Sequence, residues 1–151
     1  MGELGGNGIR GALAIGSVVP KSCSLGGLVF LSPKKVLIVD DQYGIRLLLK
    51  EVLAKDNINV YQASNGKQAL EVIQHEKPDL ILLDMKMPGM DGIELLRRLK
   101  QLNTRAKVIM MTAYGELDMV EEASELGAAA HFTKPFDIEE LRSEVMRQLV
   151  S

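Results

Sequence analysis

Short apolar segments alternate with segments of helical periodicity from Lys34 to the end of the chain. The apolar segments are nearly continuous and rich in aliphatic residues, as expected for strands buried on both faces of a parallel sheet. Five strands that alternate with five helices predict an α/β fold, in which right-handed crossovers place helices on both faces of the sheet. The predicted strands cover residues 35–39, 59–63, 80–83, 108–111 and, with a weaker pattern, 130–133.

The segments between the strands carry recognisable helix boundaries. Asn65 is a favourable N-cap, and Gln68 at the third helical position completes a capping-box pattern. Asp137 opens the last helix with Glu140 three residues later, and Gly127 predicts the end of the fourth helix. The first helix has an apolar stripe that we expect to face the core, formed by Ile45, Leu48, Leu49, Val52 and Leu53.

Composition excludes several classes of protein. The chain has 151 residues, of which 46% are hydrophobic and 25% charged, as in ordinary globular domains. Its net charge of -2 gives no sign of the basic face that nucleic acids require. Its single cysteine, Cys23, allows no internal disulfide, and no apolar run approaches the roughly 20 residues that span a bilayer. We therefore expect a cytoplasmic protein with no nucleic-acid or membrane partner.

The first 33 residues differ from the rest of the chain. They are rich in glycine and contain few charges. Three interpretations compete: a disordered leader, an export signal, or sequence translated from upstream of the true start. We favour the last, because the predicted domain, residues 34–151, needs nothing before Lys34.

Polar side chains follow the predicted strands where each strand ends. Asp40 and Asp41 follow the first strand, Asp84 the third, Thr112 the fourth and Lys134 the fifth. Ligands of open parallel sheets bind outside the carboxyl ends of the strands, so these groups are expected to converge at one edge. Each residue alone has an ordinary structural interpretation, such as a helix cap or a turn, but their joint occurrence in strand order favours a functional site.

The predicted cluster has a definite chemistry. Three neighbouring carboxylates repel one another unless a cation lies among them, and hard oxygen ligands suit Mg²⁺. With its charge offset in this way, Asp84 could attack phosphorus, as in other aspartyl-phosphate chemistry. Lys134 would counter the charge of the phosphoryl oxygens, and Thr112 could donate a hydrogen bond to one of them.

The motifs that contain these residues resemble the response-regulator receiver family across residues 35–150. The resemblance implies a flavodoxin-like (βα)5 fold, a doubly wound parallel sheet with strand order 2-1-3-4-5. The matching motifs are Val39-Asp40-Asp41, Leu83-Asp84-Met85-Lys86-Met87-Pro88-Gly89-Met90-Asp91-Gly92, Met111-Thr112-Ala113 and Lys134-Pro135-Phe136.

The resemblance also implies roles for individual residues. Asp84 would be phosphorylated, and Asp41, Asp84 and the backbone carbonyl of Lys86 would bind Mg²⁺, for which Mn²⁺ can substitute. Asp40 would hold metal-bound water. The peptide bond between Lys134 and Pro135 is expected to be cis.

Further motifs are similar to the single-domain receivers of the sporulation phosphorelay. They cover residues 41–46, 112–119 and 131–138. This resemblance implies an intermediate carrier that accepts phosphate from sensor histidine kinases, passes it to a histidine phosphotransferase, and binds no DNA. Aspartyl-phosphate phosphatases are further expected partners.

The same resemblance implies a partner surface at the mouth of the site. Ile45 and Leu48 could instead belong to the core, Gln42 could be a solvated loop residue, and Tyr114 a static surface residue. The implied surface consists of Gln42, Tyr43, Gly44, Ile45, Leu48, Tyr114, Pro135 and Phe136.

Three other functions compete with a phosphoryl carrier. The first is a chemotaxis-type regulator whose phosphorylated form binds a target protein. The second is a phosphatase of the haloacid-dehalogenase type, but Lys86 stands where such enzymes have a second aspartate. The third is a receiver that signals without phosphate, which the presence of Asp41, Asp84, Thr112 and Lys134 disfavours.

Overall fold

A computed structural model describes residues 33–113 and 117–150 of the chain. Its centre is a five-stranded parallel sheet with the order β2-β1-β3-β4-β5, which confirms the expected topology. The strands are β1 Lys34–Val39, β2 Ile58–Ala63, β3 Leu80–Asp84, β4 Lys107–Thr112 and β5 Ala130–Thr133. The interpretations of the leader and the expectation for Tyr114 concern residues outside the described ranges.

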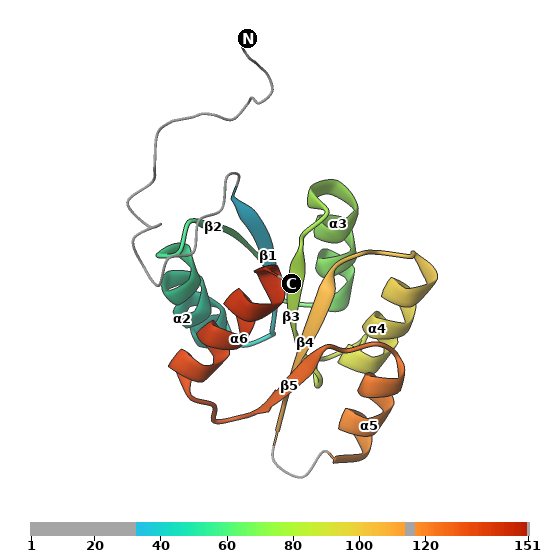
Figure 1. The fold of residues 1–151 in the computed structure, drawn as a ribbon. Coiled ribbons are helices and arrows are strands. Elements are labelled where there is room, and N and C mark those ends of the chain that lie inside the picture. Colours follow the sequence, from blue (N-terminus) through green and yellow to red (C-terminus); the bar gives the residue numbers. More distant parts are fainter. Residues whose placement is uncertain (1–32, 114–116, 151) are drawn as a thin grey trace.

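Helices cover both faces of the sheet. Helices α2 and α6 lie on one face, and α3, α4 and α5 lie on the other (Figure 1). The helices are α2 Tyr43–Ala54, α3 Gly66–Glu76, α4 Gly92–Gln101, α5 Leu117–Glu125 and α6 Ile138–Val150. No helix in the described part of the chain is long and apolar enough to cross a membrane.

The central strands contribute to two cores because consecutive side chains of a strand point to opposite faces. This explains why β1 and β3 are almost continuously apolar. Toward α3, α4 and α5, the strands contribute Leu37, Val39, Ile81, Leu83, Val108 and Met110. Toward α2 and α6, they contribute Val36, Ile38, Leu80, Leu82, Ile109 and Met111.

The predicted helix boundaries are largely confirmed. The Asn65 side chain accepts a hydrogen bond from the backbone N–H of Gln68 at 2.8 Å, as expected of an N-cap. The Gln68 side chain, however, accepts from the N–H of Ser64 at 2.9 Å, one residue before the position that a capping box requires. Asp137 accepts from the N–H of Glu140 at 3.2 Å.

The predicted inward stripe of α2 is wrong at one position. Leu49 and Leu53 are each only 1% exposed, whereas Leu48 is 44% exposed. A helix turns by about 100° per residue, so Leu48 lies at the flank of the face that points to the sheet. Sequence spacing alone placed Leu48 close enough to the stripe to be counted with it.

Polar contacts join neighbouring helices on the surface. Helices α4 and α5 lie side by side (Figure 1), and Arg97 of α4 forms an ion pair with Glu122 of α5. On the other face, Arg142 of α6 binds both carboxylate oxygens of Asp56 at 2.6 Å, and Asp56 is only 6% exposed. This bidentate pair connects α6 to the segment between α2 and β2.

Candidate functional site

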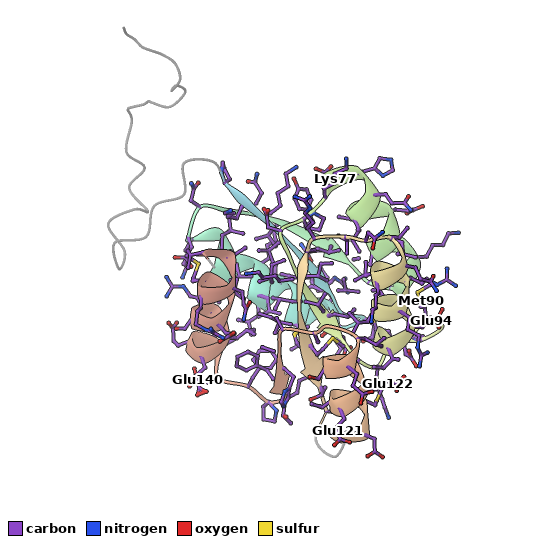
Figure 2. The ribbon with its side chains drawn as sticks, turned by 45° about the vertical axis from the view of Figure 1, so that its right-hand side comes forward. Lys77, Met90, Glu94, Glu121, Glu122 and Glu140 are labelled. Carbon is purple, nitrogen blue, oxygen red and sulfur yellow. The ribbon has the colours of Figure 1, made fainter. Side chains whose placement is uncertain are left out.

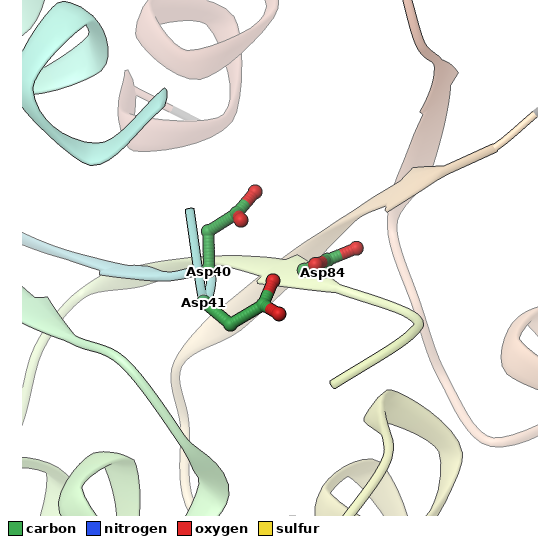
Figure 3. Close-up of side chains that lie close together, drawn as sticks. All are labelled: Asp40, Asp41 and Asp84. Carbon is green, nitrogen blue, oxygen red and sulfur yellow. The ribbon is translucent and has the colours of Figure 1, made fainter. Parts of the chain in front are cut away.

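Three carboxylates gather at the carboxyl ends of β1 and β3. Asp40 and Asp41 follow β1, and Asp84 is the last residue of β3. Figure 3 shows the three side chains beside one another. One oxygen from each carboxylate lies within 4.8 Å of the others. The predicted convergence of these residues therefore occurs.

Lys134, which follows β5, reaches two of these carboxylates. Its Nζ donates a hydrogen bond to Oδ2 of Asp40 at 2.9 Å and lies 3.5 Å from Oδ1 of Asp84. Burial alone would lower the pKa of Lys134, but the hydrogen bond to Asp40 and the nearby negative charges raise it above its ordinary value. Lys134 therefore remains a cation beside Asp84.

Asp84 has a strongly perturbed acidity. The pKa of Asp84 is raised from 3.8 to about 6, mainly by burial, then by the charge of Asp40 and, to a smaller extent, by that of Asp41. The charge of Lys134 and the backbone N–H of Lys86, 3.4 Å from Oδ1, act in the opposite direction. The negative charge of Asp84 is therefore only partly compensated by the protein, as expected at a functional carboxylate.

The donor set fits a hard divalent cation. Mg²⁺ prefers carboxylate and carbonyl oxygens and retains several waters. Asp40 is fully buried and Asp84 is 6% exposed, whereas Asp41 is exposed to solvent. The cluster thus has a buried side, which Lys134 contacts, and an open side on which a hydrated cation has room.

Asp40 is held by contacts that sequence reasoning did not identify. Its backbone N–H donates to the carbonyl of Ala63 at 3.1 Å, and its Oδ1 accepts from the N–H of Gln42 at 2.9 Å. Nη1 of Arg46 donates to the backbone carbonyl of Asp40 at 2.6 Å. Arg46 also lies over the ring of Tyr43, 5.6 Å from its centroid. The sequence offered no signal for this role beyond a lone arginine in the first turn of α2.

Gly92 fixes the loop that follows Asp84. The N–H of Gly92 donates to the carbonyl of Met85 at 2.8 Å. A Cβ at this position would lie 2.7 Å from the carbonyl oxygen of Asp84 and 2.8 Å from the Cα of Met85. Only glycine allows α4 to begin this close to the end of β3. The Asp91-Gly92 pair in the motif was a signal for such a turn.

Thr112 ends β4 and is 1% exposed. Its hydroxyl donates to the carbonyl of Phe132 at 3.3 Å, and its own carbonyl accepts from the N–H of Lys134 at 2.7 Å. Thr112 therefore joins the end of β4 to β5 and the loop that carries Lys134. To donate to a bound anion instead, the hydroxyl would have to turn away from Phe132.

The predicted partner surface lies at the start of α2 and after β5. Tyr43 is 66% exposed, and Gln42 and Gly44 are also exposed, whereas Ile45 is half-buried and packs on the core. Pro135 is exposed and follows a cis peptide bond, as the resemblance implied. Phe136 is half-buried, and its ring packs edge to face on that of Phe132, with the ring centroids 6.5 Å apart.

Leu47 belongs to the same exposed part of α2. It is 39% exposed, beside Leu48, which is 44% exposed. Sequence reasoning missed Leu47 because it fell outside the apolar stripe. Its exposure extends the apolar surface of α2 beyond the predicted residues.

The chain is similar to known proteins of one family. The response regulator receiver domain family matches residues 36–146. Over 116 residues the chain is 60% identical to sporulation initiation phosphotransferase F of Bacillus subtilis, covering 77% of this chain and 94% of that protein. It is 37% identical over 116 residues to chemotaxis protein CheY of the same organism, covering 76% of this chain and 97% of that protein.

A solved structure agrees with the fold. The crystal structure of a CheY-like response regulator receiver domain protein from Methanospirillum hungatei superposes with a TM-score of 0.75. It is 33% identical in sequence, and the match covers 79% of this chain and 95% of that chain.

Proposed function

This chain belongs to the response regulator receiver family, and we propose that it is an intermediate phosphoryl carrier in a phosphorelay that initiates sporulation. Asp84 accepts a phosphoryl group from a phosphohistidine of a sensor histidine kinase and passes it to a histidine of a histidine phosphotransferase. The observation that carries this proposal is the Asp84 carboxylate, which lies beside two further carboxylates and 3.5 Å from Nζ of Lys134. The similarity to a sporulation phosphotransferase over 94% of its length supports the pathway.

Asp41, Asp84 and the backbone carbonyl of Lys86 are the proposed ligands of Mg²⁺ or Mn²⁺. When bound, the cation offsets the charge of the carboxylates and of an incoming phosphoryl group. Asp40 lies on the buried side of the cluster, where its Oδ2 holds Lys134 at 2.9 Å. In this arrangement Asp40 positions the ammonium group, and Asp41 and Asp84 would hold the cation.

The proposed transfer is a displacement at phosphorus. A carboxylate oxygen of Asp84 forms a bond to phosphorus while the bond between phosphorus and the imidazole nitrogen breaks. The electron pair of that bond stays on the nitrogen that carried the phosphoryl group, and the ring, which is protonated on its other nitrogen, leaves as neutral imidazole. Lys134 offsets the charge of the phosphoryl oxygens, and the Thr112 hydroxyl donates to one of them. The second transfer reverses these steps toward a histidine of the next carrier.

The exposed residues around this site are the proposed docking surface for both partners. Tyr43 and Leu48 offer exposed apolar area on α2, which begins two residues after Asp41. The exposed Pro135 and the half-buried Phe136 follow Lys134. A helix that carries the partner's histidine can approach the open side of the cluster from this surface. Aspartyl-phosphate phosphatases would use the same approach.

A second function is a diffusible regulator whose phosphorylated form binds a target protein. The similarity to a chemotaxis protein over 97% of its length favours this alternative. The two functions differ in the fate of the phosphoryl group. A relay carrier returns it to a histidine, whereas a binding regulator loses it to water.

Phosphotransfer profiling tests the proposal. The full chain is mixed with each ³²P-labelled sensor histidine kinase of its cell in the presence of Mg²⁺, and then with each histidine phosphotransferase. We expect rapid labelling of the chain and transfer of the label to a phosphotransferase. Asp84→Asn should take up no label, and Asp118→Asn, an exposed carboxylate of α5, should be labelled normally.

Each alternative result has a distinct meaning. Label that stays on the chain with every phosphotransferase would support the binding regulator. Label on Asp84→Asn would contradict the proposed acceptor. Labelling that is unaffected by EDTA would contradict the proposed cation.

A further inference from the structure

Two adjoining hollows lie at the end of the sheet opposite to Asp84. The larger has a volume of about 580 Å³ and lies between the end of α3 and the segment 102–106, which precedes β4. The smaller, of about 270 Å³, lies between α4, β4 and the end of α5. They share Asn103, Thr104 and Ala106. The larger volume is typical of small-molecule sites.

The hollows have a positive lining in a protein whose net charge is -2. Lys77 and Arg105 line the larger hollow and Lys100 the smaller one. None of these three cations forms an ion pair with any residue in the ranges 33–113 and 117–150. Lys77 extends from the end of α3 (Figure 2).

The cations outweigh the negative groups around them. Asp79 is the acidic residue of the larger lining, and its Oδ2 already accepts a hydrogen bond from the N–H of Lys35 at 2.8 Å. The carboxyl ends of α3 and α4 each add about half a negative charge. The three cations carry three positive charges, and Asp79 and the two helix ends together carry about two negative charges. About one positive charge therefore remains for a ligand to neutralise.

The lining also offers apolar surface. Ile73 is buried and forms part of the wall, while Leu102 is 50% exposed. The other large apolar side chains with such exposure in the described residues belong to α2 or to the end of α6. Leu102 is thus an isolated apolar side chain that borders a hollow with a cationic lining. A ligand with an apolar body would cover it.

We propose that these hollows bind a small organic anion, one that carries a carboxylate, sulfonate or phosphate group on an apolar ring or short chain. The anionic group lies near Lys77 and Arg105, and the apolar body lies against Leu102 and Ile73. This site is independent of the phosphoryl chemistry, because it lies at the amino ends of β3 and β4, whereas Asp84 ends β3.

The test uses 8-anilinonaphthalene-1-sulfonate as the probe, because it joins a sulfonate to aromatic rings. The probe is titrated into the ¹⁵N-labelled full chain, and backbone amide shifts are recorded by NMR. We expect saturable shifts within residues 73–79 and 102–106. N-phenyl-1-naphthylamine, which lacks the sulfonate, and inorganic phosphate, which lacks the rings, should each bind at least about tenfold more weakly.

Variants assign the binding energy to the proposed residues. The double variant Lys77→Gln/Arg105→Gln should raise the Kd of the probe about tenfold, because two partly exposed charge pairs are lost. Leu102→Asn should also weaken binding. Lys67→Gln removes an exposed lysine from the opposite end of α3 and should leave the Kd unchanged. Asp84→Asn should also leave it unchanged, which separates this site from the phosphoryl site.

Three results would overturn the proposal. The first is an absence of saturable shifts in the two segments, including the case in which the probe shifts only α2. The second is an equal Kd for the double variant and the unmodified chain. The third is equally tight binding of the neutral amine, which would make the hollows an apolar site without preference for anions. The amide spectrum of each variant also reports whether it is folded.

Discussion

Replacing Asp84 by asparagine should stabilise the metal-free protein at neutral pH. Burial and the charge of Asp40 raise the pKa of Asp84 from 3.8 to about 6. A pKa difference of one corresponds to roughly 1.4 kcal/mol, so the ionised carboxylate destabilises the folded state by about 3 kcal/mol. Asparagine has nearly the same shape and keeps an oxygen acceptor, but it carries no charge. We expect Asp84→Asn to be more stable by about 2–3 kcal/mol at pH 7.5.

The pH dependence follows from the raised pKa of Asp84. Between pH 6 and 4 the folded protein holds a proton on Asp84 that the unfolded chain releases, so lowering the pH stabilises the folded state. The advantage of Asp84→Asn is therefore complete above about pH 7, declines through about pH 6 and disappears below about pH 4. Urea denaturation in EDTA, followed by circular dichroism at several pH values, measures this difference.

Two controls make the measurement specific. Glu121→Gln removes an exposed carboxylate from α5 and should change the stability by less than about 0.5 kcal/mol. Added Mg²⁺ should stabilise the unmodified chain more than Asp84→Asn, because a ligand stabilises the state that binds it. The reasoning is refuted if Asp84→Asn is no more stable at pH 7.5, or if its advantage is the same at pH 5.

Three further predictions concern other parts of the chain. Arg142→Ala leaves the buried Asp56 without its partner and should lower the free energy of unfolding by about 2–4 kcal/mol, and the control Arg147→Ala, at an exposed ion pair, should lower it much less. Equal losses of the two variants in urea denaturation would contradict this. Gly92→Ala should cost about 1–3 kcal/mol and slow phosphorylation, because the new Cβ meets the Asp84 backbone; an unchanged labelling rate would argue against it. Deletion of residues 1–33 should preserve folding and phosphoryl labelling of Asp84. A deletion variant that fails to fold or to take up label would show that the leader is needed.

The pattern of apolar residues determined most of the fold. Strands buried on both faces must be almost continuously apolar, and β1, β3 and β4 have this pattern. The helices were recognisable because their buried residues recur with helical spacing and their ends carry caps such as Asn65. Periodicity predicted a parallel sheet, but the strand order came from the family resemblance, because spacing does not say which strands pair.

The sequence also determined where the site would lie, because parallel strands all end at one edge of the sheet. It did not distinguish the two neighbouring acids. Asp40 is fully buried against Lys134, whereas Asp41 is exposed. Which acid contacts the lysine depends on how the chain turns after β1 and on where the end of β5 places Lys134, 94 residues away from Asp40 in sequence.

The remaining features depend on contacts between distant segments. No local sequence pattern indicates the Arg142–Asp56 pair or the exposure of Leu48. Local sequence determines whether a segment prefers a helix or a strand and which of its faces is apolar, because both properties depend on residues close together in the chain. The partner of a charged group, and the burial that raises the pKa of Asp84, depend on which segments pack together, and only the tertiary structure decides that.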